Sequence, residues 1–536
     1  MDLRYILERI PAHTRDNAIF TFEKGQVVRR TFADAYDDVV AARNRLAEWG
    51  VGTGTRVGIR SPNCYDWLIH DLALIELRAP LVSFTDDFAN ANPAELCEKY
   101  GLSLFLAGAA ERSRGWSETY IAYFGSRNSN VRVKEQPPQP ADPEFDRPGY
   151  IFSSGSAGGL KGLILNRKGI ESCVDAFTMA VVPRRDDRLL LFLPISNFQQ
   201  RLMYYSAFWY GFDLIVIDPV HLFRALSELE PTILIAPPAL YETFETRFCN
   251  LPESKQRLAK TLGGIASAIP VGPIRKRLGR LIFRQAHEAL GGHMRFMVTG
   301  MAPIKRSTLE LFSLMQLPLY ETYGLIESGS VALNLPGKLR LGSVGKLLPG
   351  VKVDFTAEGE IMVRREHPIA VGYFECVEGE NERTFLDDGA VATGDIGRFD
   401  DDGYLYLVGR KKEIIVTGGG EKIHPEVIEA DLNGCPDVER AVILGRDHST
   451  SVAAVVRSKQ PGDAASQKRI EQHVAELNKR LSKVNVGKVI FTDIVFTREN
   501  GFLRPNLKLD RKRINAHFQP EIEEKPLVKQ AAEGGR

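Results

Sequence analysis

A glycine- and serine-rich loop follows a short apolar strand in Tyr150-Ile151-Phe152-Ser153-Ser154-Gly155-Ser156-Ala157-Gly158-Gly159-Leu160-Lys161-Gly162. Glycines allow backbone N–H groups to point inward around an anion, serine hydroxyls add hydrogen-bond donors, and a lysine supplies positive charge. The loop is therefore suited to hold phosphate groups, although it lacks the Walker spacing G-x-x-x-x-G-K-[ST]. Taken alone, such a loop is more often an ordinary surface turn, so the assignment needs support from the rest of the chain.

Apolar strands alternate with amphipathic helices on both sides of this loop. Arg56–Arg60 reads as a strand, and Tyr65–Leu77 has apolar residues at helical spacing. Further buried strands are expected at Leu189–Leu193, Leu214–Ile217, Ile233–Ala236 and Phe296–Val298, with helices at Leu222–Leu229 and Lys305–Met315. This alternation predicts an α/β fold whose large N-terminal domain has parallel-rich sheets and flanking helices.

From about Gly342 onward, the alternating strands and helices give way to shorter, turn-rich segments. Short β-like segments follow, Val351–Phe355, Gly359–Val363 and Tyr404–Val408, which predict a β-rich subdomain. After Arg410 a smaller unit is expected, with a helix, two strands and a long helix at Pro425–Leu432, Arg440–Leu444, Ala453–Val456 and Ala464–Ser482. We therefore predict a large domain at 1–409 and a small mobile α+β domain at 410–536, with a hinge at about 410–413.

Length and composition narrow the classes of protein to which this chain could belong. The 536 residues exceed the roughly 250–300 that one hydrophobic core supports. The 69 Lys and Arg nearly balance the 68 Asp and Glu, which gives no indication of a nucleic-acid partner. The scattered cysteines form no C-x-x-C, the chain starts without an apolar signal core, and no apolar run approaches about 18 residues. We expect a cytoplasmic protein without a membrane span; the oligomeric state cannot be read from the sequence.

Two further motifs fit nucleotide binding. In Glu321-Thr322-Tyr323-Gly324-Leu325-Ile326-Glu327, an aromatic ring beside a glycine can stack on a base, and a carboxylate can hold a divalent cation. In Thr393-Gly394-Asp395, a carboxylate in a tight turn can accept hydrogen bonds from ribose hydroxyls. The alternatives are a core tyrosine with a solvated glutamate, and an aspartate that bonds its own turn.

A basic cluster lies near the end of the chain, in Glu499–Arg513. Lys508 stands between Leu507 and Leu509, so strand alternation would turn its side chain away from both. Such clusters are usually solvated surface, which remains the alternative.

In this order, the four motifs resemble those of the superfamily of acyl- and aryl-CoA synthetases, adenylation domains and luciferases. The resemblance is closest to the long-chain fatty acyl-CoA synthetases and extends over about residues 30–515. It implies an AMP-forming acid–thiol ligase that uses ATP (or acyl-AMP), Mg²⁺ and coenzyme A. A carboxylic acid would first form acyl-AMP, and CoA would then displace AMP.

The resemblance also implies roles for individual residues. Lys508 would act in adenylation, and Lys412 would be the hinge. Glu327 would bind magnesium, and Asp395 would bind ribose. Arg410 matches the family arginine that comes after the next strand, and it would also help to bind the nucleotide. Tyr323, next to Gly324, would stack on adenine. The phosphate loop would use Ser153, Ser154, Gly155, Ser156, Gly158 and Lys161; the pantetheine tunnel would use Gly418, Gly419 and Gly420; and the acyl pocket would use Asn197, Phe198, Gly300 and Met301.

Several positions depart from the family pattern. Ala157 and Leu160 replace a threonine and the proline of the phosphate loop, and Ile326 replaces a threonine before Glu327. Because a hydroxyl bonded to a charged phosphate contributes about 1.5–3 kcal/mol, we expect a weak or lost adenylation half-reaction. Met301 stands where backbone usually approaches substrate, and Asn197 where many relatives have histidine. Four candidate pocket residues suggest a bulky apolar acid, with core packing as the alternative for the aromatic ones: Phe198, Trp209, Tyr210 and Met301.

Three other functions remain open at this point. The protein could act only on preformed acyl-AMP, load an acyl group onto a carrier protein, or bind acyl-adenylate without catalysis. Lys508 argues against a pure binder, which has no need of it. The sequence has no obvious insertion before the hinge of the kind fatty acyl-AMP ligases carry, which favours CoA.

Overall fold

The computed structural model describes residues 1–126, 130–136, 142, 144–154, 160–417, 421–445, 449–481, 484–497, 499–503 and 509–523. Seven predicted site residues lie outside these residues: Gly155, Ser156, Gly158, Gly418, Gly419, Gly420 and Lys508. The chain divides into a large unit, Met1–Ala357 with Ile361–Thr393 and Phe399–Tyr406, and a small unit, Glu358–Glu360 with Gly394–Arg398 and Leu407–Arg536. The predicted boundary at residue 409 and the hinge role of Lys412 stay predictions.

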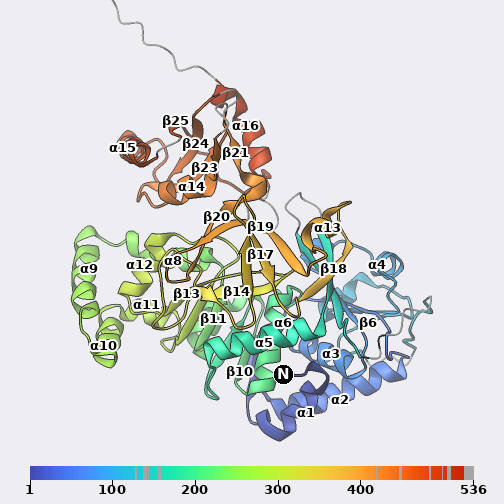
Figure 1. Cartoon of the computed structure of the whole chain (residues 1–536). Helices are drawn as coiled ribbons and strands as arrows, with labels where there is room; N and C mark the ends of the chain where they lie inside the picture. Colours follow the sequence, from blue (N-terminus) through green and yellow to red (C-terminus); the bar gives the residue numbers. More distant parts are fainter. Residues whose placement is uncertain are drawn as a thin grey trace, which may run out of the picture. The chain divides into compact units, whose positions relative to one another are not determined.

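The large unit contains a broad sheet in the order β15-β14-β13-β12-β11-β9-β10-β1-β2, of which β10, β11, β13 and β14 are labelled in Figure 1. From β1 through β10, β9, β11 and β12 to β13, neighbouring strands run parallel. Parallel strands are buried on both faces, which explains why they read as continuous apolar runs. Their bounds are β1 Ala18–Glu23, β2 Gln26–Thr31, β9 Arg188–Leu191, β10 Asp213–Val216, β11 Ile233–Ala236, β12 Phe296–Thr299, β13 Leu319–Leu325, β14 Gly329–Leu333 and β15 Lys346–Leu347.

A second sheet of the large unit has the order β18-β8-β7-β4-β3-β5-β6. The strands β7, β4, β3, β5 and β6 are parallel, and β8 and β18 add antiparallel strands at one edge. The hairpin from β7 to β8 contains the predicted phosphate loop. The bounds are β3 Val57–Arg60, β4 Leu81–Ser83, β5 Leu104–Ala107, β6 Ile121–Tyr123, β7 Gly149–Ser154, β8 Leu160–Leu165 and β18 Ala370–Glu375.

Helices flank these sheets in the way the sequence predicts. A capping box starts α2, because the Thr31 hydroxyl accepts from the Asp34 N–H at 3.0 Å and Asp34 accepts from the Thr31 N–H at 2.7 Å. The helix α3 is apolar on nearly all sides and is accordingly buried. The helices are α1 Ile6–Arg9, α2 Phe32–Glu48, α3 Tyr65–Glu76, α4 Pro93–Tyr100, α5 Arg167–Val181, α6 Phe198–Tyr210, α7 Leu222–Leu229, α8 Pro238–Cys249, α9 Glu253–Ser267, α10 Gly272–Ile282, α11 Arg284–Ala289, α12 Arg306–Leu314 and α13 Glu380–Thr384.

A β-rich sheet in the order β16-β17-β19-β20 follows, with β16 Lys352–Phe355, β17 Glu360–Arg364, β19 Ala390–Phe399 and β20 Leu405–Arg410. The division between the two units falls within β17, β19 and β20. The small unit has its own hydrophobic core around Val438, Ala454 and Ile470. Its remaining elements are β21 Ile415–Val416, β22 Lys422–Ile423, α14 Pro425–Asn433, β23 Val438–Leu444, β24 Val452–Ser458, α15 Ala464–Arg480, β25 Val486–Phe491 and α16 Arg511–Glu523.

The structure confirms the predicted α/β class, with parallel-rich sheets, a β-rich subdomain and a smaller α+β part. Among the described residues, no helix is both long enough and apolar enough to cross a bilayer.

Candidate functional site

The predicted phosphate lysine and the predicted metal-binding glutamate meet at one tyrosine. The Tyr373 hydroxyl donates to Glu327 Oε1 at 2.8 Å, and Lys161 Nζ donates to the same hydroxyl at 3.4 Å. Lys161 also forms an ion pair with Glu380 at 2.8 Å. Burial raises the pKa of Tyr373, and the negative charge of Glu327 raises it further, so the hydroxyl stays protonated and available as a donor.

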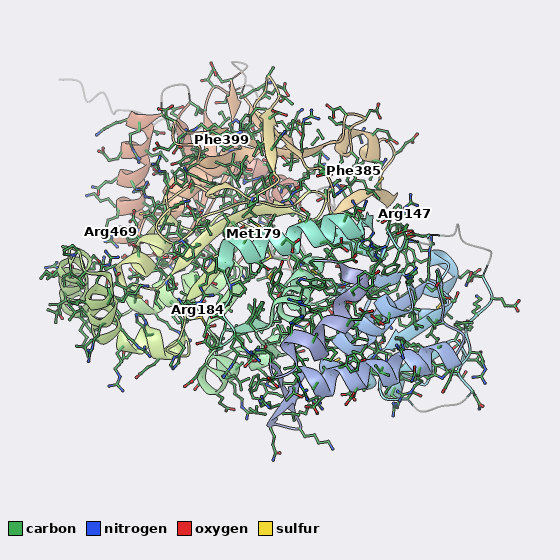
Figure 2. The ribbon with its side chains drawn as sticks, turned by 60° about the horizontal axis from the view of Figure 1, so that its bottom comes forward. Arg147, Met179, Arg184, Phe385, Phe399 and Arg469 are labelled. Atoms are coloured by element: carbon green, nitrogen blue, oxygen red, sulfur yellow. The ribbon has the colours of Figure 1, made fainter. Side chains whose placement is uncertain are left out.

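Tyr373 is held in place by the strands and by its neighbours. Its strand β18 pairs with β8, which carries Lys161, and its ring lies 5.1 Å from the ring of Phe385, labelled in Figure 2. Lys161 Nζ lies 5.0 Å from the centroid of the Tyr373 ring. Sequence reasoning missed Tyr373 and Glu380, because neither belongs to a recognised motif and both are far from Lys161 along the chain.

The serines of the phosphate loop lie at the end of β7. Ser153 stands opposite Lys161 in the antiparallel register, and Ser154 is the last residue of that strand. Ser153 and Lys161 are therefore brought together at the mouth of the hairpin.

Tyr323 and Gly324 lie on β13, at a break in its register with β14. A Cβ at Gly324 would meet Gly329 O and Ser330 Cα, each at 2.8 Å, so only glycine fits this close approach of backbones. The Tyr323 side chain is 7% exposed and packs within the main hydrophobic core. Its adenine-stacking role stays a prediction.

Two buried polar groups lie side by side where β12 ends: Thr299 is the last residue of β12, and Glu321 is the third residue of β13. Thr299 and Glu321 are aligned in the parallel register, and neither Thr299 Oγ1 nor Glu321 Oε2 has a hydrogen-bond partner in the described part of the chain. Burial raises the pKa of Glu321 to about 8, so the carboxyl keeps its proton at neutral pH and is able to donate a hydrogen bond. Ligands of α/β sheets bind outside the carboxyl ends of strands, and unpartnered buried polar atoms there fit a polar ligand. Sequence reasoning passed over both residues.

The predicted acyl-pocket residues lie at two places in the large unit. Gly300 and Met301 follow β12, and Met301 is 40% exposed with a φ of 70°, a left-handed conformation that favours glycine. Asn197 is the residue before α6. Phe198 is 1% exposed and lies in the core, where the Arg201 guanidinium is 5.2 Å from its ring.

The predicted ribose aspartate is buried and already has a cationic partner. Asp395 is 5% exposed, and Arg410 Nε lies 2.8 Å from its Oδ1. The structure thus joins two residues that the sequence predicted separately for the nucleotide. Nearby in the small unit, Glu360 accepts from the Gly394 N–H at 3.0 Å and from Lys411 at 2.9 Å, which fixes the turn before Asp395. Lys412, one residue later, is exposed.

A carboxylate cluster in the small unit was not predicted. Arg511 pairs with Glu413 at 2.9 Å and donates to Glu429 Oε2 at 2.7 Å. Burial, together with the neighbouring Glu413 carboxyl, raises the pKa of Glu426 to about 7. A buried carboxyl group with a pKa in this range makes the stability of the small unit depend on pH.

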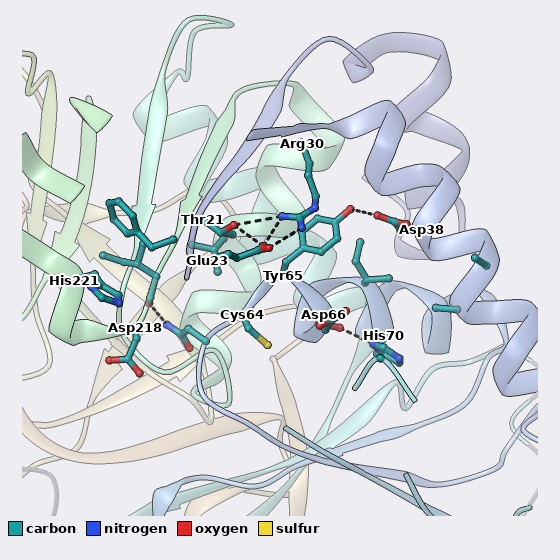
Figure 3. A pocket seen from close by; sticks show the side chains of 18 of the residues that line it. Thr21, Glu23, Arg30, Asp38, Cys64, Tyr65, Asp66, His70, Asp218 and His221 are labelled. Carbon is teal, nitrogen blue, oxygen red and sulfur yellow. Dashed lines mark hydrogen bonds and ion pairs between the residues drawn. The ribbon is translucent and has the colours of Figure 1, made fainter. Parts of the chain in front are cut away.

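A cavity of about 480 Å³ lies elsewhere in the large unit, between α2, α3, the β1–β2 hairpin and the end of β10 (Figure 3). Its polar side chains are largely paired with one another: Arg30 with Glu23 at 2.6 Å, and the Tyr65 hydroxyl with Asp38 at 2.7 Å. None of the predicted site residues lines it.

Glu327 and the residue that orients it are suited to bind Mg²⁺ together with the phosphates of a nucleotide. Tyr373 orients one oxygen of Glu327, and carboxylate oxygen is a ligand that Mg²⁺ prefers. Within the described ranges, no group of three or more His, Cys, Asp or Glu side chains forms a metal site. Glu327 would hold such an ion, and the ion would neutralise charge on the phosphates.

Comparisons with known proteins cover nearly the whole chain. A family profile described as AMP-binding enzyme matches residues 7–374, and one described as AMP-binding enzyme C-terminal domain matches residues 412–525. The long-chain-fatty-acid–CoA ligase FadD15 of Mycobacterium bovis is 28% identical over 553 residues, which cover 92% of this chain and 91% of that protein.

Solved structures share the fold. The o-succinylbenzoate CoA synthetase of Bacillus subtilis, in complex with ATP and magnesium ion, has a TM-score of 0.71 at 19% identity and covers 95% of this chain and 98% of its own. A fatty acyl CoA synthetase of Mycobacterium tuberculosis has a TM-score of 0.63 at 20% identity and covers 97% of this chain and 99% of its own.

Proposed function

Because the chain belongs to the AMP-binding enzyme family, we propose that it is an AMP-forming acid–thiol ligase that joins a fatty acid to coenzyme A. The similarity to a long-chain-fatty-acid–CoA ligase over nearly the full length of both chains supports this activity. The observation that carries the proposal is the chain of contacts from Lys161 through Tyr373 to Glu327, which sets a cation beside a carboxylate suited to magnesium. We expect the enzyme to act in the cytoplasm.

The reaction has two halves. A carboxylate oxygen of the acid attacks the α-phosphorus of ATP, the bond to the β-phosphate oxygen breaks, and pyrophosphate leaves. Lys161 and Lys508 are proposed to stabilise the charge on the phosphates. Magnesium, when held by Glu327, would add charge neutralisation there. In the second half the CoA thiolate attacks the acyl carbon, and AMP leaves with the oxygen that joined it to the acyl group.

Asp395 and Arg410 are proposed to hold the AMP moiety in both halves. Asp395 is buried beside Arg410, so a ribose that bonds to it would share that carboxylate with the guanidinium. The small domain is proposed to turn about Lys412 between the two halves, withdrawing Lys508 and presenting Gly418, Gly419 and Gly420 to pantetheine.

We further propose that the adenylation half is weak or lost. Ala157, Leu160 and Ile326 change positions that face the β- and γ-phosphates or the metal in the family, and acyl-AMP no longer carries those groups. These departures favour a second candidate function, a CoA ligase that acts only on preformed acyl-AMP. The acid is proposed to be bulky and apolar, since Met301 projects a long apolar side chain after β12 where relatives have glycine.

The test supplies the full chain with Mg²⁺, CoA and two alternative sources of acyl group. One arm contains ATP with a series of fatty acids, and the other contains the corresponding acyl-AMP. We expect the acyl-AMP arm to form CoA thioester at least about tenfold faster than the ATP arm, as loss of one phosphate contact predicts. Thioester from the acyl-AMP arm alone would identify the second candidate function. Absence of thioester in both arms would refute ligase activity, and transfer only to a carrier protein would identify the alternative acceptor.

A further inference from the structure

The helices α9 and α10 lie side by side at one edge of the large unit (Figure 1). Each packs inward through a glycine. A Cβ at Gly263 would lie 2.9 Å from the Leu314 side chain, and a Cβ at Gly279 would lie 2.5 Å from Gln316 Cγ. Nothing larger than glycine fits these contacts without displacing a neighbour. The two glycines therefore fix which face of each helix packs inward, and so also which face points outward.

The outward faces carry apolar side chains. On α9 they follow helical spacing at i, i+4 and i+7, and on α10 at i and i+7, so each set forms one stripe. The exposed fractions are 59% for Leu258, 41% for Leu262, 61% for Ile265, 52% for Ile274 and 70% for Leu281. Exposed apolar side chains lined up on helices in this way mark a site of interaction with a membrane or another molecule.

Positive charge surrounds these stripes. Residues 253–284 contain eight Lys and Arg and a single acidic residue, Glu253, although the whole chain has 69 basic and 68 acidic residues. Arg257 pairs with Glu253, and Arg284 pairs with Glu288. In the parts of the chain that are described, the other six have no ion pair: Lys255, Lys260, Arg275, Lys276, Arg277 and Arg280.

We propose that the α9–α10 face docks on the surface of an anionic lipid bilayer. Its leucine and isoleucine stripes would enter the boundary between headgroups and acyl chains, while the surrounding Lys and Arg contact anionic headgroups. A nucleic acid would satisfy the cations but leave the stripes in water. A second copy of this chain, docked through the same face, would bring two positively charged surfaces together, and their like charges would repel. This docking does not depend on the proposed reaction. If the chain is a fatty acid–CoA ligase, however, docking would place it beside a bilayer that contains its substrate.

The experiment is co-sedimentation of the full chain with vesicles of phosphatidylcholine, with and without phosphatidylglycerol. We expect binding only to the vesicles that contain phosphatidylglycerol. The variant K276E/R277E should weaken it by about 25-fold or more, since each basic residue near an anionic surface contributes about fivefold. The variant L258S/L281S should weaken it at least about tenfold through loss of buried apolar area.

Two matched controls keep the test specific. K459E/K468E makes the same change of net charge on exposed residues of the small unit, and M179S/V427S removes exposed apolar side chains of other helices. Both should bind vesicles like the parent protein, and all four variants should unfold at the parent temperature. The proposal is overturned if the parent does not bind anionic vesicles, or if the controls lose binding as much as the α9–α10 variants. It is also overturned if the parent binds duplex DNA instead, or if L258S/L281S acts only by dissociating a dimer.

Discussion

Replacing Tyr373 with phenylalanine tests whether this residue positions Glu327 for magnesium. The change removes only the hydroxyl that donates to Glu327 at 2.8 Å, and the ring keeps its contact with Phe385 at 5.1 Å. A hydrogen bond to a charged group contributes about 1.5–3 kcal/mol, which corresponds to about tenfold to hundredfold in an equilibrium constant. Removing the group that orients a metal ligand lowers metal affinity by a similar factor.

The assay is calorimetric binding of ATP over a titration of Mg²⁺, which does not require turnover. Tyr373→Phe should raise the Mg²⁺ concentration needed for half-maximal binding by about tenfold or more. The matched control is Tyr100→Phe, because the Tyr100 hydroxyl donates to Glu375 at 3.0 Å in a similar pair that does not involve Glu327. An unchanged Mg²⁺ requirement in Tyr373→Phe, or an equal change in the control, would refute the positioning role.

Four further outcomes are expected. Asp395→Ala should weaken AMP binding about tenfold or more, through loss of a charge-assisted hydrogen bond to ribose, and equal calorimetric affinity would show that the residue does not bind ribose. Lys412→Pro should impair one half-reaction far more than the other, because proline fixes φ at the proposed hinge, whereas equal losses would count against a hinge. Lys508→Ala should lower adenylation by about 10²–10³ and spare thioester formation from acyl-AMP; a joint loss would indicate a structural role. The pKa of Glu426 is raised from 4.5 to about 7, so between these pH values the folded protein holds a proton that the unfolded chain has lost. The free energy of unfolding should therefore fall by about 1.4 kcal/mol for each pH unit as the pH rises through this range. Glu426→Gln should flatten this dependence in denaturant unfolding, and an unchanged slope would contradict the assignment.

Local patterns predicted the regular elements well. The predicted helix Leu222–Leu229 and strand Ile233–Ala236 have the same bounds in the structure, because each apolar set is bounded by polar residues or proline. The predicted strand Leu189–Leu193 starts one residue earlier and ends two earlier as β9 Arg188–Leu191, since an apolar run continues into the loop that follows it.

Contacts between distant residues were not predictable in this way. Tyr373 lies 212 residues after Lys161 and is brought to it only by the pairing of β18 with β8. The buried pair Thr299 and Glu321 depends on the register of β12 with β13, which no motif specifies. The left-handed φ of Met301 likewise follows from the path of the loop after β12 and not from a preference of methionine.

The central claim is that the enzyme forms a thioester through an acyl-adenylate, and isotope transfer tests it most directly. The fatty acid is supplied with ¹⁸O in both carboxylate oxygens, together with ATP, Mg²⁺ and CoA, and the AMP and thioester are examined by mass spectrometry. If the carboxylate attacks the α-phosphorus, one labelled oxygen leaves with AMP and the other stays in the thioester carbonyl. We predict one ¹⁸O in each AMP released, even if turnover is slow. Thioester formed with unlabelled AMP, or with the label in inorganic phosphate, would contradict the account.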